Sequence, residues 1–222
     1  MDTVRLDERL SAIYLEIPAG GVVADIGTDH GKLAVRLASD GFKVIASDVS
    51  AASLAKARRL ARENGAEKSI DFRVGDGLNV LADGEADTVV ISGMGGREII
   101  KIIADKRIPL YVLGAQRDQP LLRRYLISVN RTILSDKTVK CAGRYYSVIA
   151  SGLGVDRTLS ELEIEFGKDF YDDPLFKERA EKEIKRLTRM YDTLLPENTW
   201  GRQAAAAETE KYREALKACR LQ

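Results

Sequence analysis

The chain has 222 residues, of which 45% are hydrophobic and 31% are charged. This length and composition are typical of one full α/β domain with a smaller appendage and a substantial core. The net charge is +1, which excludes a chain that binds polyanions over its whole surface, so any nucleic-acid contact must be a local patch. Cys141 and Cys219 match no metal-ligand spacing and favour a reducing, cytoplasmic compartment. The charged N-terminus and the lack of a long apolar run predict neither a secretion signal nor a membrane span.

Residues with helical spacing of apolar positions open the chain and end at Pro18. The apolar face of this predicted helix consists of Leu6, Leu10, Ile13 and Ile17. Arg5 and Arg9 fall on its outer surface. They either contact a substrate backbone or belong to a solvated helix face, and the second arrangement is the more common one.

An apolar run that begins at Val22 ends in an acid, turns through glycine and polar residues, and enters Lys32–Ala38, whose apolar positions recur at helical spacing. This pattern predicts a strand, a tight turn and a helix whose N-terminus offers backbone N–H groups to a ligand. The turn contains only Gly27 and Gly31, whereas a dinucleotide fingerprint needs three glycines. Its acids, Asp25 and Asp29, suit a ligand with an ammonium group better than a pyrophosphate. S-adenosylmethionine is such a ligand.

A second predicted strand, Phe42–Asp48, also ends in an acid. Asp48 comes about 20 residues after the glycine turn, where Rossmann-like folds place a carboxylate that binds ribose hydroxyls. The alternative role, the N-cap of the helix predicted over Ala51–Asn64, is better filled by Ser50. We therefore predict cofactor contacts by Asp48 and by the adjacent Val49.

Asp76 and Gly77 follow the third predicted strand, Ile70–Val74. The carboxylate of Asp76 is placed to bind the amine of an adenine ring, but Asp-Gly pairs also favour plain β-turns, and spacing alone does not separate the two. A fourth, apolar strand over Ala86–Ile91 belongs in the centre of a parallel sheet. The glycine-rich segment Ser92–Gly96 after it allows a ligand to approach the backbone closely.

The next segments complete the predicted sheet. A helix over Arg97–Ala104, a fifth strand over Leu110–Gly114 and a helix over Leu121–Ser128 precede two strands, at Thr132–Lys140 and Tyr145–Ala150. The last two form a β-hairpin, whereas a dehydrogenase would close its sheet with another parallel unit.

Two long helices are predicted beyond residue 154, from Asp173-Pro174 to Leu195 and from Thr199 to Leu221. The first has apolar residues at helical spacing, at Phe176, Ala180, Ile184, Leu187 and Tyr191. We predict a domain over 1–154 and a helical, coiled-coil-like domain over 155–222. Basic residues on the first helix, including Lys182 and Arg186, either bind phosphates or pair with the interleaved glutamates, which is at least as common.

These segments together resemble the bacterial tRNA adenine-22 N1-methyltransferase family, over nearly the whole chain. The resemblance is carried by the following strings: Arg9-Leu10, Ala24-Asp25-Ile26-Gly27-Thr28-Asp29-His30, Asp76-Gly77-Leu78, Ser92-Gly93-Met94-Gly95-Gly96, Leu122-Arg123, Gly143-Arg144-Tyr145-Tyr146 and Glu165-Phe166-Gly167. The first glycine string and the later one are specific as a pair. The chain departs from many members at Gln116-Arg117-Asp118, where they read Gln-Pro-Asn, and at Ser50-Ala51-Ala52, where they have Gly-Pro.

The resemblance implies an α/β, Rossmann-like class I methyltransferase sheet with a helical C-terminal appendage. It implies methyl transfer from S-adenosylmethionine to N1 of an adenine in the D-arm region of a tRNA, by a cytoplasmic protein that we expect to be a monomer. The residues expected to contact the cofactor are Asp25, Gly27, Thr28, Asp48, Val49, Asp76, Gly77, Ser92 and Gly93. Those expected at the reacting base are Asp29, His30, Gly93 and Met94, and those expected to contact RNA are Arg5, Arg9, Arg97, Arg117, Lys182 and Arg186. The alternative role of Asp29 and His30 is to cap the helix and bind the methionine moiety of the cofactor.

Two other functions remain open from the residues. The protein is either an S-adenosylmethionine-dependent methyltransferase of another substrate or a tRNA-binding protein that holds the cofactor without catalysis. The helical appendage and the scattered arginines argue mildly against a small-molecule or protein substrate.

Overall fold

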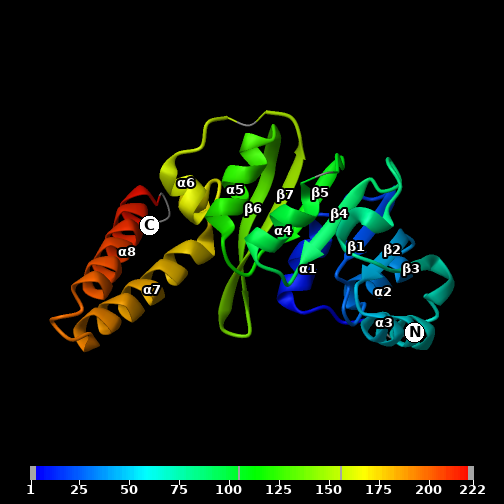
Figure 1. Cartoon of the computed structure of the whole chain (residues 1–222), viewed down its shortest axis with the longest axis horizontal. Coiled ribbons are helices and arrows are strands. Elements are labelled where there is room, and N and C mark those ends of the chain that lie inside the picture. The colour runs from blue at the N-terminus through cyan, green and yellow to red at the C-terminus, as the bar shows by residue number, and fades with distance from the viewer. Residues whose placement is uncertain (1–3, 105, 156, 220–222) are drawn as a thin grey trace. The chain divides into compact units, whose positions relative to one another are not determined.

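The computed structural model describes residues 4–104, 106–155 and 157–219, and it divides into two compact units, Met1–Thr158 and Leu159–Gln222 (Figure 1). The sequence predicts this division after residue 154, a few residues before the observed one. None of the helices in the described ranges combines the length and hydropathy that a membrane-spanning segment requires.

The first unit is built on a seven-stranded sheet in the order β3-β2-β1-β4-β5-β7-β6. Strands β1 to β5 are parallel, and β7 runs antiparallel to both β5 and β6, which confirms the predicted closing hairpin. The chain reverses its direction of progress across the sheet between β1 and β4, which is where open α/β sheets bind ligands. The strands are β1 (Val22–Ile26), β2 (Lys43–Asp48), β3 (Ile70–Val74), β4 (Thr88–Ser92), β5 (Leu110–Gly114), β6 (Arg131–Cys141) and β7 (Arg144–Leu153).

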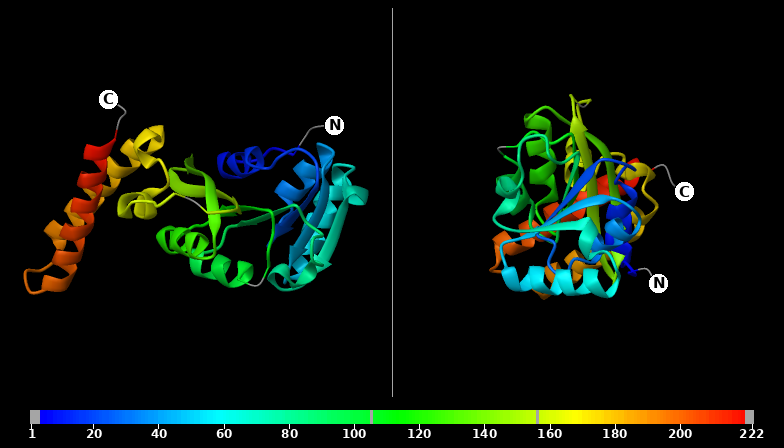
Figure 2. Two further views of the ribbon diagram at one scale, coloured as in Figure 1. Left: turned by 90° about the horizontal axis from the view of Figure 1, so that it is seen from above. Right: turned by 90° about the vertical axis from the view of Figure 1, so that its right-hand side faces the viewer.

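Helices cover both faces of this sheet, and α1 and the α4–α5 pair lie on opposite sides of it (Figure 2). Helices α1, α2 and α3 share one core cluster with the sheet, in which Ile13, Leu37 and Ala61 are buried. The helices are α1 (Glu8–Leu15), α2 (Lys32–Ser39), α3 (Ala51–Glu63), α4 (Gly96–Ile103) and α5 (Gln119–Ser128), with 3-10 turns η1 (Glu67–Ser69) and η2 (Gly77–Val80). Burial of apolar side chains on both faces explains why the central strands are continuously hydrophobic.

Local signals set most of these boundaries. The side chain of Ser50 accepts a hydrogen bond from the Ser53 N–H, so Ser50 is the N-cap of α3, as predicted. Strands β6 and β7 are longer than predicted, since their ladder continues to the pair Cys141–Arg144. The two residues between them, Ala142 and Gly143, both have positive φ, which is the geometry of a tight hairpin turn.

The hairpin side of the sheet buries charge. The guanidinium of Arg123, in α5, lies 2.7 Å from the carboxylate of Asp136, in β6, and both side chains are almost fully buried. Arg131 is also buried, donates hydrogen bonds to the carbonyls of Ile108 and Ser151, and packs over the Tyr111 ring. The Arg123–Asp136 pair joins α5 to β6, and the Arg131 hydrogen bonds join the start of β6 to β7 and to the segment before β5.

The second unit contains α6 (Glu161–Phe166), η3 (Phe170–Asp172), α7 (Pro174–Thr193) and α8 (Thr199–Ala218). Asp173 caps α7, as predicted, by accepting from the Leu175 N–H. Its core is aromatic and consists of Phe166, Phe170, Phe176 and Tyr212, together with smaller apolar residues. Of the predicted apolar face, Phe176, Ala180 and Leu187 are buried, whereas Ile184 and Tyr191 are half-buried.

Two boundary predictions differ from this unit. The first long helix ends at Thr193 rather than at Leu195, which is exposed. The second ends at Ala218, and its predicted end at Leu221 lies outside the described residues. The helix α6 was not predicted, because six residues are too few to show a helical period.

Candidate active site

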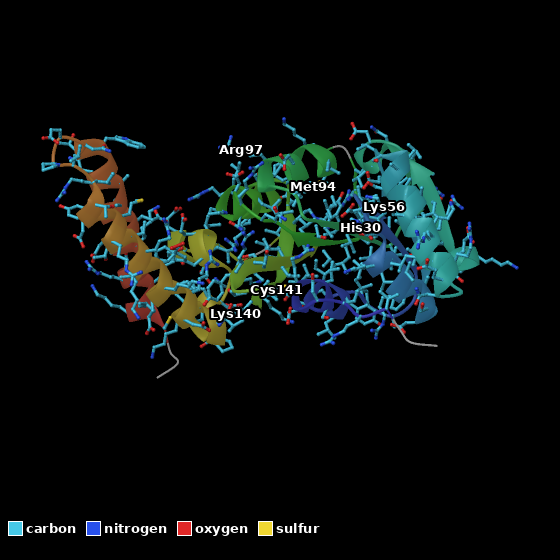
Figure 3. The ribbon with its side chains drawn as sticks, turned by 90° about the horizontal axis from the view of Figure 1, so that it is seen from below. His30, Lys56, Met94, Arg97, Lys140 and Cys141 are labelled. Carbon is cyan, nitrogen blue, oxygen red and sulfur yellow. The ribbon has the colours of Figure 1, made fainter. Side chains whose placement is uncertain are left out.

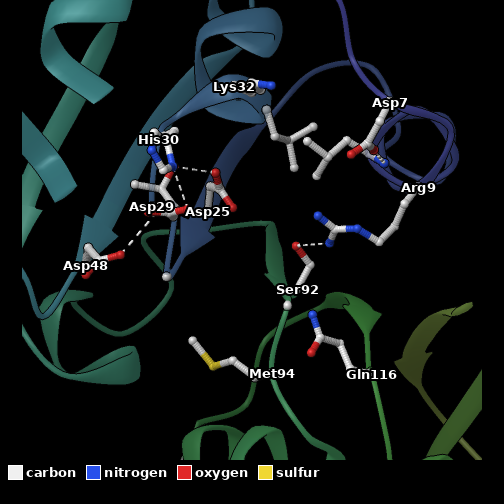
Figure 4. Close-up of a pocket in the computed structure, with 15 residues that line it drawn as sticks. Asp7, Arg9, Asp25, Asp29, His30, Lys32, Asp48, Ser92, Met94 and Gln116 are labelled. Atoms are coloured by element: carbon white, nitrogen blue, oxygen red, sulfur yellow. Dashed lines mark hydrogen bonds and ion pairs between the residues drawn. The ribbon is translucent and has the colours of Figure 1, made fainter. Parts of the chain in front are cut away.

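A pocket of about 600 Å³ opens at the carboxyl ends of β1, β2 and β4, beside the switch in strand order (Figure 4). Its size is in the range of pockets that bind small molecules and cofactors. The pocket is lined by Asp7, Arg9, Leu10, Asp25, Gly27, Thr28, Asp29, His30, Lys32, Leu33, Asp48, Ser92, Gly93, Met94 and Gln116. Sequence segments that are far apart therefore meet at this edge of the sheet.

The end of β1 presents a buried carboxylate to the pocket. Asp25 is only 4% exposed and accepts a hydrogen bond of 2.6 Å from the Thr28 hydroxyl. Burial raises the pKa of the Asp25 carboxyl to about 6, against the lowering effects of Thr28 and the Arg9 guanidinium. The N–H groups of Gly27 and Thr28 both donate to the Ser47 carbonyl, at 2.8 and 2.9 Å, so the turn is anchored to β2.

Asp48, at the end of β2, holds the same turn in place. One of its oxygens accepts from the Asp29 N–H at 3.1 Å and the other accepts from the Ser50 N–H at 2.8 Å. Each carboxylate oxygen retains a lone pair for a further donor, such as a hydroxyl. The structure therefore orients Asp48 toward the pocket and leaves it able to bind a ligand.

Asp29 and His30 form a contacting pair at the mouth of the pocket. The Asp29 carboxylate lies 2.6 Å from His30 Nδ1, and both side chains are more than half exposed. Asp29 has a φ of +50°, a left-handed conformation that Asp and Asn adopt more readily than most residues. This geometry projects a carboxylate and an imidazole over the glycine turn.

The glycine-rich segment after β4 forms the facing wall and is bonded to the segment after β5. Gly93 N–H donates to the Gly114 carbonyl, and Gln116 N–H donates to the Met94 carbonyl at 2.9 Å. Gly93 has a φ of +85°, and a Cβ built there would meet no atom within 4 Å, so this wall is bare. The Met94 methyl covers Gly27, where any Cβ would lie 2.5 Å from it.

Arg9 lies inside the pocket, on α1. Its guanidinium donates to the Ser92 hydroxyl at 3.3 Å and lies over the Tyr146 ring, 5.8 Å from the ring centre. Contact with an RNA phosphate stays a prediction for this residue, and its position next to Ser92 shows that it also shapes the small-molecule pocket.

The other predicted cofactor contacts do not line this pocket. Val49 is 68% exposed just after β2, Asp76 is exposed, and Gly77 begins η2. Among the predicted RNA contacts of the first unit, Arg5 is exposed. The guanidinium of Arg97 lies 3.7 Å from the Asp118 carboxylate, and that of Arg117 lies 3.1 Å from the Glu98 carboxylate. Figure 3 shows Arg97 pointing outward from α4, while His30 and Met94 belong to the pocket. Lys182 and Arg186 lie on α7, in the second unit, and Arg186 is paired with Glu183.

Five lining residues were not predicted as site residues: Asp7, Leu10, Lys32, Leu33 and Gln116. Gln116 could have been found, since it comes two residues after β5 ends and ligands collect at such strand ends. Asp7 shows only the signature of a helix N-cap, which it is, because its side chain accepts from the Leu10 N–H. Its presence in the pocket depends on how α1 packs on the sheet.

The strand order, the antiparallel β7 and an acid-lined glycine turn at the switch point define the class I methyltransferase fold. The family model described as "Methyltransferase domain" matches residues 6–149. The chain belongs to this methyltransferase-domain family.

Relatives with the same architecture cover nearly the whole chain. A Bacillus subtilis tRNA (adenine(22)-N(1))-methyltransferase is 28% identical over 98% of this chain and 93% of its own length. The structure of M. capricolum TrmK in complex with S-adenosyl-homocysteine is 27% identical, has a TM-score of 0.86, and covers 97% of this chain and 99% of that chain. The B. subtilis m1A22 tRNA methyltransferase TrmK superposes with a TM-score of 0.81 at 23% identity, over 96% of this chain and 99% of that chain. The resemblance predicted from the sequence is thereby confirmed.

Proposed function

We propose that this protein transfers a methyl group from S-adenosylmethionine to N1 of adenine 22 in the D-arm region of tRNA. The observation that carries the proposal is the meeting of Asp25, Asp48 and the bare Gly93 segment in one pocket. The similarity to a tRNA (adenine(22)-N(1))-methyltransferase over 98% of the chain supports the choice of substrate.

The pocket fits S-adenosylmethionine on its own chemistry. The buried Asp25 carboxylate would accept the ammonium group, and Asp48, anchored between two backbone N–H groups, would accept the ribose hydroxyls. Gly27, Thr28, Ser92 and Gly93 would line the cofactor, with Val49, Asp76 and Gly77 as proposed contacts beyond the pocket. When bound, S-adenosylmethionine supplies a methyl group that its sulfonium has already activated.

The protein would mainly position the base. Adenine N1 is unprotonated at neutral pH, so alignment with the methyl group is the main requirement, and such positioning is worth roughly 7–11 kcal/mol. Methylation leaves a positive charge on the base. The Asp29 carboxylate, beside His30, would stabilise this charge or accept a proton from N6. Gly93 and Met94 would form the slot that the base enters.

The RNA would contact basic residues of the sheet unit and of the helical unit. N1 is paired in a folded arm, so the base has to leave its stack, as in other base-modifying enzymes. Proposed phosphate contacts are Arg5, Arg9, Arg97, Arg117, Lys182 and Arg186. In this proposal residues 1–154 bind the cofactor and residues 155–222 assist tRNA binding, in a cytoplasmic monomer.

A labelled-methyl assay on an unmodified tRNA transcript, followed by nucleoside analysis, tests the proposal. The expected product is 1-methyladenosine, formed with an A22 transcript and lost with a G22 transcript. Calorimetry with S-adenosylmethionine separates the alternatives. Cofactor binding without methylation of tRNA would favour another substrate or a non-catalytic tRNA-binding role, and no cofactor binding would contradict the proposal.

A further inference from the structure

We propose that Gln116 selects adenine, by pairing its side-chain amide with N6 and N7 of the target base. This inference rests on the proposed function, because it names the residue that recognises the substrate of that reaction. It concerns a residue that the sequence analysis left out of the site.

The backbone of Gln116 is fixed, but its side chain is not engaged. The Gln116 N–H donates to the Met94 carbonyl, which ties the residue to the glycine wall. Within the described part of the chain, the side-chain amide makes no hydrogen bond. It lies on the wall of the pocket with Ser92 and Met94, and Figure 4 shows it facing the same space. An anchored residue with an unused amide at a ligand pocket is suited to recognition.

The pocket has two chemically different sides. The carboxylates of Asp25, Asp29 and Asp48 all come from the ends of β1 and β2. The side formed by the end of β4 and the segment after β5 contributes the uncharged residues Ser92, Gly93, Met94 and Gln116, and the Arg9 guanidinium reaches this side only through its hydrogen bond to the Ser92 hydroxyl. The acidic side suits the ammonium and hydroxyl groups of the cofactor, which leaves the neutral side for a planar, uncharged base.

The reaction itself restricts which edge of adenine can be read. N1 must face the methyl group, so the remaining edge that offers both an acceptor and a donor carries N7 and the N6 amine. A primary amide offers one acceptor and one donor at matching separation, which is why Gln and Asn pair with adenine at these two atoms. Guanine presents two acceptors, N7 and O6, on the same edge, and its N1 carries a proton.

The neighbouring polar groups are less suited to this task. A guanidinium such as that of Arg9 favours the two acceptors of guanine, and Arg9 already donates to Ser92. The Met94 carbonyl accepts from the Gln116 N–H and, as a carbonyl, offers no donor for N7. Among the lining residues on this side, Gln116 alone offers both a donor and an acceptor on one planar group.

The test combines an atomic change in the tRNA with a change in the protein. One tRNA carries 7-deazaadenosine at position 22, which lacks the N7 acceptor, and a control tRNA carries it at an adenosine outside the D arm. The variant Gln116→Glu keeps an acceptor for N6 and loses the donor for N7. We expect 7-deazaadenosine at position 22 of the tRNA to lower kcat/KM of the wild-type enzyme roughly five- to hundredfold. Gln116→Glu should lose a similar factor on normal tRNA and lose nothing further with 7-deazaadenosine.

The outcomes separate this inference from the proposed function. If the wild-type enzyme methylates normal tRNA but accepts 7-deazaadenosine equally well, or if the two losses multiply, Gln116 does not read N7. If the wild-type enzyme methylates no tRNA, the proposed function fails and the inference fails with it. Calorimetry with S-adenosylmethionine checks the fold of Gln116→Glu. Gln116→Met, which has no amide, should likewise lose nothing further with 7-deazaadenosine.

Discussion

The two units of this protein differ in how they use distant parts of the sequence. In the sheet unit, Asp25, Asp48, Ser92 and Gln116 come from four different strand ends and meet in one pocket. In the helical unit, the aromatic core gathers Phe166, Phe170 and Phe176 from one stretch, with Tyr212 opposite. The sheet therefore builds a site out of residues that are distant in sequence, whereas most of the helical unit's aromatic core comes from one stretch of the chain.

The two units also treat charge differently. The sheet unit buries the Arg123–Asp136 pair and the Asp25 carboxylate, whereas the Arg186–Glu183 pair on α7 lies at the surface. A buried charge is costly to disturb, and an exposed pair contributes little. Changes at the buried charges of the first unit should consequently have large effects, and changes at the exposed Arg186–Glu183 pair small ones.

The largest effect is expected at Asp29. Asp29→Asn removes the charge but keeps a side chain that tolerates a φ of +50°, so the fold should survive. We expect kcat on unmodified tRNA to fall roughly 10²–10⁴-fold, the usual range for a lost proton acceptor or charge-stabilising group. Calorimetry should show that cofactor binding is weakened less than by Asp48→Asn. Unchanged turnover would remove Asp29 from the catalytic residues.

The next effect concerns the stability of the helical unit. Phe176 is fully buried and contacts the rings of Phe166 and Phe170. Phe176→Ala should lower the free energy of unfolding of this unit by about 3–5 kcal/mol. If the units differ as described, affinity for S-adenosylmethionine should stay within twofold of wild type while KM for tRNA rises. A matching loss of cofactor affinity would show that the pocket depends on the helical unit.

A smaller effect is expected from the titration of Asp25. Its pKa is about 6 in the folded protein, above the ordinary 3.8, so the folded state binds the proton more tightly. The contribution of this group to stability is therefore favourable in acid and is lost as the pH rises from about 4 to 6, on the order of 3 kcal/mol in total. Denaturant unfolding should show Asp25→Asn gaining stability relative to wild type across this window.

Ionisation of Asp25, which lowers the stability of the fold, should raise the affinity for the cofactor. An ammonium group needs the ionised carboxylate, so affinity for S-adenosylmethionine should increase as the pH rises through about 6, and Asp25→Asn should lack this dependence. Isothermal calorimetry at pH 5 and pH 7.5 measures both. Equal slopes in wild type and variant would assign the pH dependence to another group.

The smallest effect on stability is expected at Arg186. Its pair with Glu183 is exposed, so Arg186→Ala should change the free energy of unfolding by less than about 1 kcal/mol. If Arg186 contacts a phosphate, the variant should bind tRNA more weakly and lower the slope of log K against log salt by about one. Glu183→Ala is the matched control, since it breaks the same pair without removing the cation. If both variants bind tRNA identically, Arg186 contacts no phosphate and serves only in the surface ion pair.

Local patterns were sufficient for much of the fold. Alternation and apolar runs located β3 and β5 at their observed bounds, and the capping residues Ser50 and Asp173 marked the starts of α3 and α7. The strand-end acids and the Ser92–Gly96 segment could also be identified as site residues, because the carboxyl ends of parallel strands share one edge. The short helix α6 could not, because it has too few residues for a period.

The sequence by itself determined the strands, the long helices and the acid-and-glycine character of the pocket, because these depend on neighbours within a few residues of each other. Only the tertiary structure decided that Arg9 sits beside Ser92, that Gln116 lies on the pocket wall, and that Arg123 and Asp136 are buried together. These arrangements join residues on elements that are distant in sequence. Their distances depend on how the helices pack against the twisted sheet, which no local pattern records.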